Sequence, residues 1–153
     1  MESRYELFSA AISSMHHDIQ KIERMEMAHY GLKGPHAQCL LALRRYPEGL
    51  TAARLCEVCE KDKAAISRIL TELESAGMVT REQKNGSRYR AALYLTPQGH
   101  AAAQAVVEKA RLAVELAGTG FNDAEREIFY RVLTIIAGNL HSICREGLNK
   151  DPL

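Results

Sequence analysis

The sequence predicts a mainly α-helical fold that carries one small β-hairpin. Apolar residues recur every three or four positions through most of the 153-residue chain, which is the period of an amphipathic helix. Residues 78–95 break this period, because two strand-like runs flank Asn85-Gly86, a strong signal for a hairpin turn. Hydrophobic residues make up 46% of the chain and charged residues 25%, as is ordinary for a globular protein. We therefore expect a single compact subunit.

The first thirty residues are expected to form one long helix. Its apolar stripe consists of Leu7, Phe8, Ala11, Ile12, Met15, Ile19, Ile22 and Met25. Gly31 and Gly34-Pro35 should end it, because glycine admits unusual backbone angles and proline restricts the residue before it. A short helix over residues 36–45 follows.

Two further short helices are expected over residues 51–59 and 62–75. Thr51 is a suitable N-cap for the first and Asp62 for the second. The second helix turns an apolar face inward, made of Ile66, Ile69, Leu70 and Leu73. Gly77 fits the position just after a helix end, where a positive φ is common.

Two long helices are expected after the hairpin. Thr96-Pro97 should start the first, because threonine caps an N-terminus and proline is favoured at the first helical position. Asn122 and Glu125 form a capping pair for the second, which should end near Glu146. Its inward face would consist of Ile128, Phe129, Val132, Leu133, Ile136, Leu140 and Ile143.

The two short helices, their tight connection and the hairpin after them describe a winged helix-turn-helix. The helix over residues 62–75 would then be the recognition helix, which enters the major groove of duplex DNA. The face opposite its apolar stripe carries Lys63, Ala64, Ser67, Arg68 and Thr71. None of these is acidic, small side chains allow close approach, and arginine can reach guanine O6 and N7. An ordinary solvent-exposed helix face is the alternative.

The hairpin tip adds a second basic element, with Lys84, Arg88 and Arg90 around the turn. Such a loop can lie against phosphates or insert an arginine into the minor groove. The net charge of the chain is only +1, but Lys61–Arg90 holds seven Lys or Arg against four Asp or Glu. This segment fits an anionic partner, although a plain surface hairpin can also carry cations to protect its edges.

These motifs, taken in order, resemble the MarR (multiple antibiotic resistance regulator) family from about Gly31 to Gly99. The matching stretches are LTAARLCEVCEKDKAAISRILTELESAGMVTR and LYLTPQG. They resemble the family's recognition helix, its L-E-x-x-G-x-V-x-R exit into the wing, and the L-T-x-x-G start of the next helix. The matching positions are Asp62-Lys63, Ser67-Arg68, Leu73-Glu74, Gly77, Val79, Arg81, Leu95-Thr96 and Gly99.

The hairpin departs from the family pattern in one respect. The family wing usually carries Asp-x-Arg, whose arginine reaches the minor groove. Counting back from Leu95-Thr96, the positions of this element hold Ser87, Arg88 and Tyr89. The Asp is therefore absent, and the Arg is displaced by one residue. Arg88 or Arg90 would substitute, and the sequence leaves open which of them does.

The resemblance implies a homodimeric transcription regulator that binds a pseudo-palindromic site in duplex DNA. Residues 1–153 would form one subunit, with 36–96 as the winged helix-turn-helix and 1–30 and 97–147 mainly as dimerisation helices. Intramolecular packing of those helices in a monomer is the alternative. Family members are usually repressors that respond to a small molecule, an oxidant or a metal, and the resemblance places a ligand pocket between dimer helices and winged core.

The cysteines and histidines offer weaker signals. Cys56 and Cys59 share a helix face as C-x-x-C, and a redox or metal role would need accessible thiolates. Without a second C-x-x-C a structural zinc site is not expected, and we expect these cysteines, with Cys39 and Cys144, to serve as small apolar residues. A metal-responsive site among the histidines is an alternative, for which the candidates are His16, His17, His29 and His36.

Other function classes find little support in the sequence. It lacks a glycine-rich phosphate loop, H-E-x-x-H and G-x-S-x-G, so we expect neither an enzyme nor a cofactor. It has no apolar run of about 18–20 residues and no signal peptide at its start, so we expect a cytoplasmic protein without a membrane partner. A helical interaction module that uses this fold for protein contacts is a further alternative.

Overall fold

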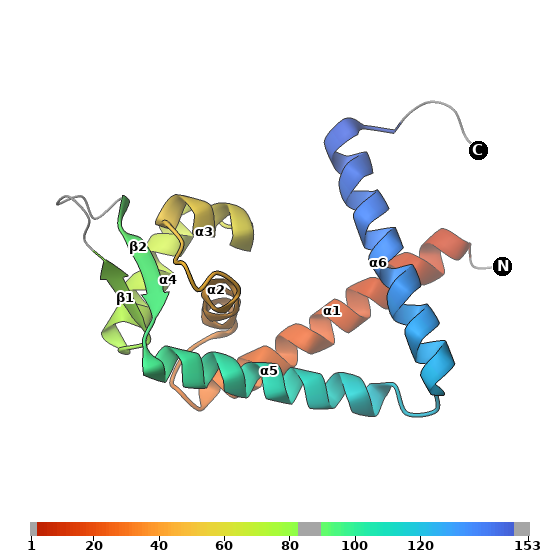
Figure 1. Cartoon of the computed structure of the whole chain (residues 1–153), viewed down its shortest axis with the longest axis horizontal. Helices are drawn as coiled ribbons and strands as arrows, with labels where there is room; N and C mark the ends of the chain where they lie inside the picture. The colour runs from red at the N-terminus through yellow and green to blue at the C-terminus, as the bar shows by residue number, and fades with distance from the viewer. Residues whose placement is uncertain (1–2, 83–89, 149–153) are drawn as a thin grey trace. The chain divides into compact units, whose positions relative to one another are not determined.

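The computed structural model describes residues 3–82 and 90–148. It contains the helices α1 (Arg4–Ala28), α2 (Gly34–Arg45), α3 (Ala52–Cys59), α4 (Lys63–Ser75), α5 (Pro97–Ala117) and α6 (Asp123–Glu146), and the strands β1 (Val79–Glu82) and β2 (Ala92–Leu95) (Figure 1). The expected fold class, mainly helical with one hairpin, is confirmed. The chain divides into two compact units, Met1–Ala113 and Val114–Leu153.

Local capping explains where the helices start. Thr51 and Asp62 each accept a hydrogen bond from the backbone N–H three residues on, at 3.2 and 2.8 Å, as the sequence predicts. Thr96 does the same for α5 at 3.1 Å, and Asn122 with Glu125 forms the full reciprocal capping box of α6. The helix starts that the sequence predicts are thus confirmed at these four caps.

The core of the first unit lies between α2, α3, α4, the hairpin and the start of α5. The four apolar residues predicted on the inner face of α4 are all buried: Ile66, Ile69, Leu70 and Leu73. From α2, Leu40 and Leu43 join them, and α5 contributes Ala102 and Val106. Helix α4 is therefore anchored along one complete face, and its other face is left for solvent or a partner.

The hairpin is fixed to the end of α4 by backbone contacts. Its strands are antiparallel, with Val79 opposite Leu95, and a bridge between Leu50 and Leu93 ties β2 to the start of α3. Gly99, in the first turn of α5, lies so close to the hairpin that an added Cβ would stand 2.0 Å from the Met78 carbonyl oxygen. Position 99 therefore requires glycine.

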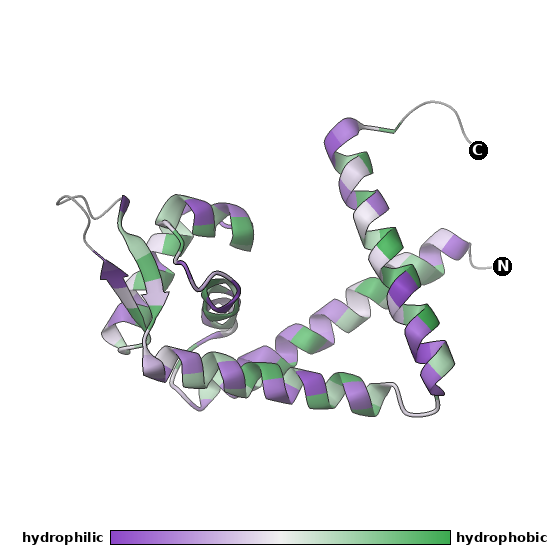
Figure 2. Cartoon of the chain, viewed as in Figure 1, coloured by the Kyte–Doolittle hydropathy of each residue, from purple (hydrophilic) through white to green (hydrophobic). Residues whose placement is uncertain are grey.

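The apolar stripes of α1 and α6 are exposed in the single chain. No residue of α6 is buried, and only Glu26 and Met27 are buried in α1. Met25, on the predicted apolar stripe, is 62% exposed, and Met27, outside that stripe, reaches the core. Figure 2 shows apolar residues recurring along both helices. The uncovered side chains include Leu7, Phe8, Ile12, Met15 and Ile19 of α1 and Ile128, Phe129, Val132, Ile135, Leu140 and Ile143 of α6.

Among the residues that the structure describes, no helix is both long and apolar enough to cross a membrane.

Candidate nucleic-acid interface

The outer face of α4 is built as the sequence predicts. Lys63, Ala64, Ser67, Arg68 and Thr71 are all exposed, and the residues behind them fill the core. The helix N-terminus is held by Asp62, whose carboxylate accepts from the Ala65 N–H. The candidate recognition face is thus a solvent-facing surface on a rigidly packed helix.

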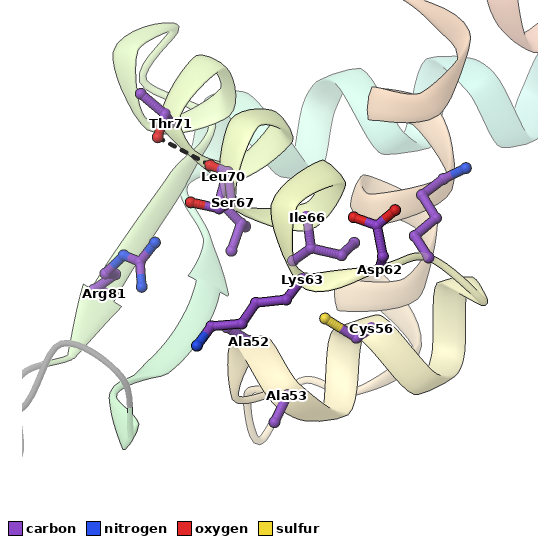
Figure 3. A pocket seen from close by; sticks show the side chains of 11 residues that line it. Ala52, Ala53, Cys56, Asp62, Lys63, Ile66, Ser67, Leu70, Thr71 and Arg81 are labelled. Carbon is purple, nitrogen blue, oxygen red and sulfur yellow. Dashed lines mark hydrogen bonds between the residues drawn. The ribbon is translucent and has the colours of Figure 1, made fainter.

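A groove of about 660 Å³ runs beside this face, between α3, α4 and β1. Figure 3 shows Ala52 and Ala53 on its α3 side, Lys63 and Ser67 on its α4 side, and Arg81 facing it from β1. Small side chains on α3 keep the groove open, and basic groups border it on the other two elements. Such a surface suits the anionic backbone of a nucleic acid.

The Thr71 hydroxyl group of the outer face is hydrogen-bonded within α4. The Thr71 hydroxyl donates to the Ser67 carbonyl oxygen at 2.9 Å, one turn earlier in the same helix (Figure 3). Its proton is therefore engaged, so in this rotamer Thr71 offers DNA an acceptor and a methyl group rather than a donor. Ser67 is exposed on the same face.

The acidic residues of α4 each have a specific partner. The ring of His36, which is 3% exposed, accepts from the Lys33 N–H through Nδ1 at 2.9 Å. In the neutral ring this leaves the proton on Nε2, which lies 2.5 Å from a carboxylate oxygen of Glu72 and donates to it. Glu74 accepts from Nε of Arg81 at the base of the hairpin. The sequence places both carboxylates near the end of α4, and the structure shows what holds them there.

The wing residues are only partly described. Lys84 and Arg88 lie outside the described residues, so their predicted contacts with DNA stay predictions. Arg90 is exposed just before β2. Arg81 is the residue that the sequence analysis did not single out as a contact, although it lies in the L-E-x-x-G-x-V-x-R motif. It is half-buried, lines the groove and is oriented by Glu74.

The cysteines are arranged differently from what the C-x-x-C spacing suggests. Cys59 Sγ lies 3.9 Å from Cys39 Sγ on α2, whereas Cys56 lines the groove shown in Figure 3. Cys39 is fully buried as expected. The expectation for Cys144 was wrong, since this residue is exposed on α6, which has no core of its own. Within residues 3–82 and 90–148, no group of three or more His, Cys, Asp or Glu is placed to hold a metal ion.

Comparison with known proteins agrees with this geometry. Residues 30–88 match the model of the MarR family. The fold is similar to that of a MarR transcriptional regulator from Methanosarcina mazei Go1, with a TM-score of 0.78 and 23% identity over 90% of this chain and 99% of that chain. It is also similar to a MarR-family transcriptional regulator from Silicibacter pomeroyi, with a TM-score of 0.72 and 20% identity over 96% of this chain and 94% of the other.

A third similar structure was solved with nucleic acid. It is a mutant of MepR from S. aureus bound to an oligodeoxyribonucleotide, with a TM-score of 0.60 and 16% identity over 87% of this chain and 97% of that chain. No protein of curated function matches this chain in sequence.

Proposed function

We propose that this chain, whose winged helix over residues 30–88 is that of the MarR family, is a sequence-specific DNA-binding regulator of transcription. The observation that carries the proposal is the outer face of α4. It is exposed and carries Lys63 and Arg68, and the two carboxylates of α4, Glu72 and Glu74, are paired with His36 and Arg81. This combination suits a helix that enters the major groove of duplex DNA.

Each residue of this face has a proposed role. Arg68 reads a guanine through O6 and N7, since arginine offers a two-pronged donor that matches this edge. Ala64 and Ser67 allow the helix to approach the bases closely, and Lys63 contacts a phosphate beside the groove. Thr71, whose hydroxyl donates within the helix, contacts a base through its methyl group. These positions are exposed together on one helix face.

The wing would contact the adjacent minor groove. Lys84, Arg88 and Arg90 supply its positive charge, and one of the two arginines enters the groove. Arg81 faces the groove between α3 and α4 from the base of the wing. We infer that its ion pair with Glu74 sets the direction from which the wing meets the DNA.

We propose that the regulator is a homodimer. Residues 1–30 and 97–147 would supply most of its dimer interface, and residues 36–96 the DNA-binding part of each subunit. The support is the exposed apolar stripes of α1 and α6, because contiguous apolar surface of this kind is characteristic of an interface. Two-fold symmetry would set the two recognition helices about one DNA turn apart on a pseudo-palindromic site.

The same proposal includes repression that an effector relieves. A cavity of about 420 Å³ lies between α1, α2 and the end of α3, and the family resemblance leads us to expect a ligand pocket between dimer helices and winged core. Its polar lining includes His16, Glu23, Arg45 and Lys61, so an effector with both polar and charged groups would fit. Thiol or metal sensing on the same fold is the alternative. We propose no catalytic role, and we propose that the regulator acts in the cytoplasm.

A gel-shift titration tests the DNA-binding proposal. The probe is the duplex upstream of the protein's own gene, and the competitor is an equal length of unrelated duplex. We expect saturable retardation that weakens steeply between low and moderate salt, because phosphate contacts release counterions. A helical interaction module would retard neither duplex, and that result would overturn the proposal.

A further inference from the structure

Two cysteines that are distant in sequence meet inside the helix-turn-helix. Cys39 on α2 and Cys59, the last residue of α3, lie with their sulfur atoms 3.9 Å apart. Cys39 is fully buried, whereas Cys59 is half-buried and lines the cavity of about 420 Å³ between α1, α2 and α3. The Cys59 thiol is thus accessible to a small solute in the cavity, whereas the Cys39 thiol is buried next to it.

The two thiols are inequivalent chemically as well as in exposure. The hydrogen bond from Cys39 lowers the pKa of the Cys59 thiol, and the nearby Lys61 ammonium lowers it further against the opposing effect of burial. The same hydrogen bond, together with burial, raises the pKa of Cys39. Cys59, whose thiol also lies 3.9 Å from the Gln38 carbonyl oxygen, is therefore the more acidic thiol of the pair, and we assign it as the nucleophile.

We propose that Cys59 and Cys39 form a hydroperoxide-sensitive thiol pair that closes to a disulfide within one subunit. The Cys59 thiolate attacks the distal oxygen of ROOH. The O–O bond breaks, a proton from solvent completes the leaving alcohol ROH, and Cys59 becomes a sulfenic acid. The Cys39 sulfur then attacks Cys59, forming the S–S bond and releasing water. In total two thiols are oxidised and one hydroperoxide is reduced.

The second step does not conflict with the protonated state of Cys39. Once Cys59 is a neutral sulfenic acid, the thiolate that held the Cys39 proton is gone. Cys39 can then lose its proton as it attacks. Because Cys39 is already adjacent, disulfide formation competes well with further oxidation of Cys59 by a second hydroperoxide.

Closure of the pair acts directly on the recognition helix. A disulfide bond is about 2.05 Å long, so the sulfur atoms must approach from their present 3.9 Å. Cys59 is followed by Glu60, which has a left-handed backbone with φ of 51°, and then by the turn to Asp62, the N-cap of α4. Pulling on Cys59 therefore displaces the connection that positions α4. The regulatory part of this inference rests on the proposed DNA-binding function and predicts weaker DNA binding by the oxidised form.

The chain supplies its own control thiols. Cys56 lies on α3 three residues before Cys59 but lines the groove in Figure 3, and Cys144 is exposed on α6. A C56S/C144S double variant therefore keeps the proposed pair and removes the competing thiols. C59S removes the nucleophile, and C39S or C39A removes the partner that resolves the sulfenic acid.

The chemical test uses equimolar cumene hydroperoxide on the reduced full chain, followed by intact mass and peptide mapping. We expect the wild type and C56S/C144S to lose two hydrogen masses and to yield a Cys39–Cys59 linked peptide. C39S, or C39A if the serine variant is poorly folded by circular dichroism, should instead give a dimedone adduct on Cys59. A disulfide between Cys56 and Cys59, a bond between two chains, or sulfinic acid without a disulfide would each overturn the assignment.

The functional test compares reduced and oxidised C56S/C144S in the gel shift. We expect oxidation to lower DNA affinity by about tenfold or more, within the usual range of coupling between sites, and dithiothreitol to restore it. Unchanged affinity with a complete disulfide would overturn the regulatory part. If the reduced protein binds no duplex at all, the proposed function fails, while mass analysis still decides whether the thiol pair exists.

Discussion

Replacing Arg68 by alanine tests the assignment of the recognition face. Arg68 is exposed on α4, so its loss should leave the free energy of unfolding within about 0.5 kcal/mol of wild type. An arginine that reads a base contributes about 1–3 kcal/mol to binding. A homodimer presents two copies, so the total is about 2–6 kcal/mol, or roughly 30-fold to more than 10⁴-fold in affinity.

Fluorescence anisotropy on the upstream duplex and on an unrelated duplex separates the possible roles of Arg68. If it reads a base, affinity for the upstream duplex falls and affinity for the unrelated one hardly changes. If it contacts phosphate, both fall together, and the salt slope of log K decreases by about 1 per chain.

Arg44→Ala is the matched control for Arg68→Ala, because it removes the same charge from an exposed site on α2, outside the recognition face and outside residues 1–30 and 97–147. We expect it to behave almost as wild type on both duplexes. The assignment of α4 as recognition helix is refuted if Arg68→Ala behaves as this control does.

Three further predictions follow from the packing and from the wing. Gly99→Ala should lower the urea concentration at the midpoint of unfolding, since the new Cβ would stand 2.0 Å from the Met78 carbonyl oxygen. Overpacking of this kind costs about 1–3 kcal/mol of stability. An unchanged midpoint would contradict the close approach. Ile135→Glu, on the exposed stripe of α6, should convert a dimer into a monomer in analytical ultracentrifugation, because each chain would place a carboxylate in the interface; a stable dimer would argue against this face. When Arg88 and Arg90 are replaced singly by alanine, only one of the two variants should lose DNA affinity, by about tenfold or more. If neither variant loses affinity, the wing does not contact the DNA.

Local signals carried most of the fold prediction. The caps at Thr51, Asp62, Thr96 and Asn122 depend on a side chain and a backbone N–H three residues away, so the sequence contains all that is needed. The two faces of α4 follow in the same way from its period, and the structure buries and exposes the residues as predicted.

The features that the sequence did not predict depend on contacts between segments that are distant along the chain. The spacing of Cys56 and Cys59 suggests a pair on one helix, yet the neighbour of Cys59 is Cys39, twenty residues earlier on α2. His36 and Glu72 are separated by 36 residues, and only the packing of α2 against α4 brings them together. The period of α6 predicts an apolar face but not what covers it, and the single chain leaves that face exposed.

The most direct test of the central claim, that α4 enters the major groove, is protection of guanine N7 from dimethyl sulfate on the bound upstream duplex. Guanine N7 lies in the major groove and adenine N3 in the minor groove, so the reagent reports on both. We predict two clusters of protected guanines, with centres about 10 base pairs apart, and loss of protection at specific guanines with Arg68→Ala. A fully bound duplex without any N7 protection, or with protection at adenine N3 alone, would contradict the account.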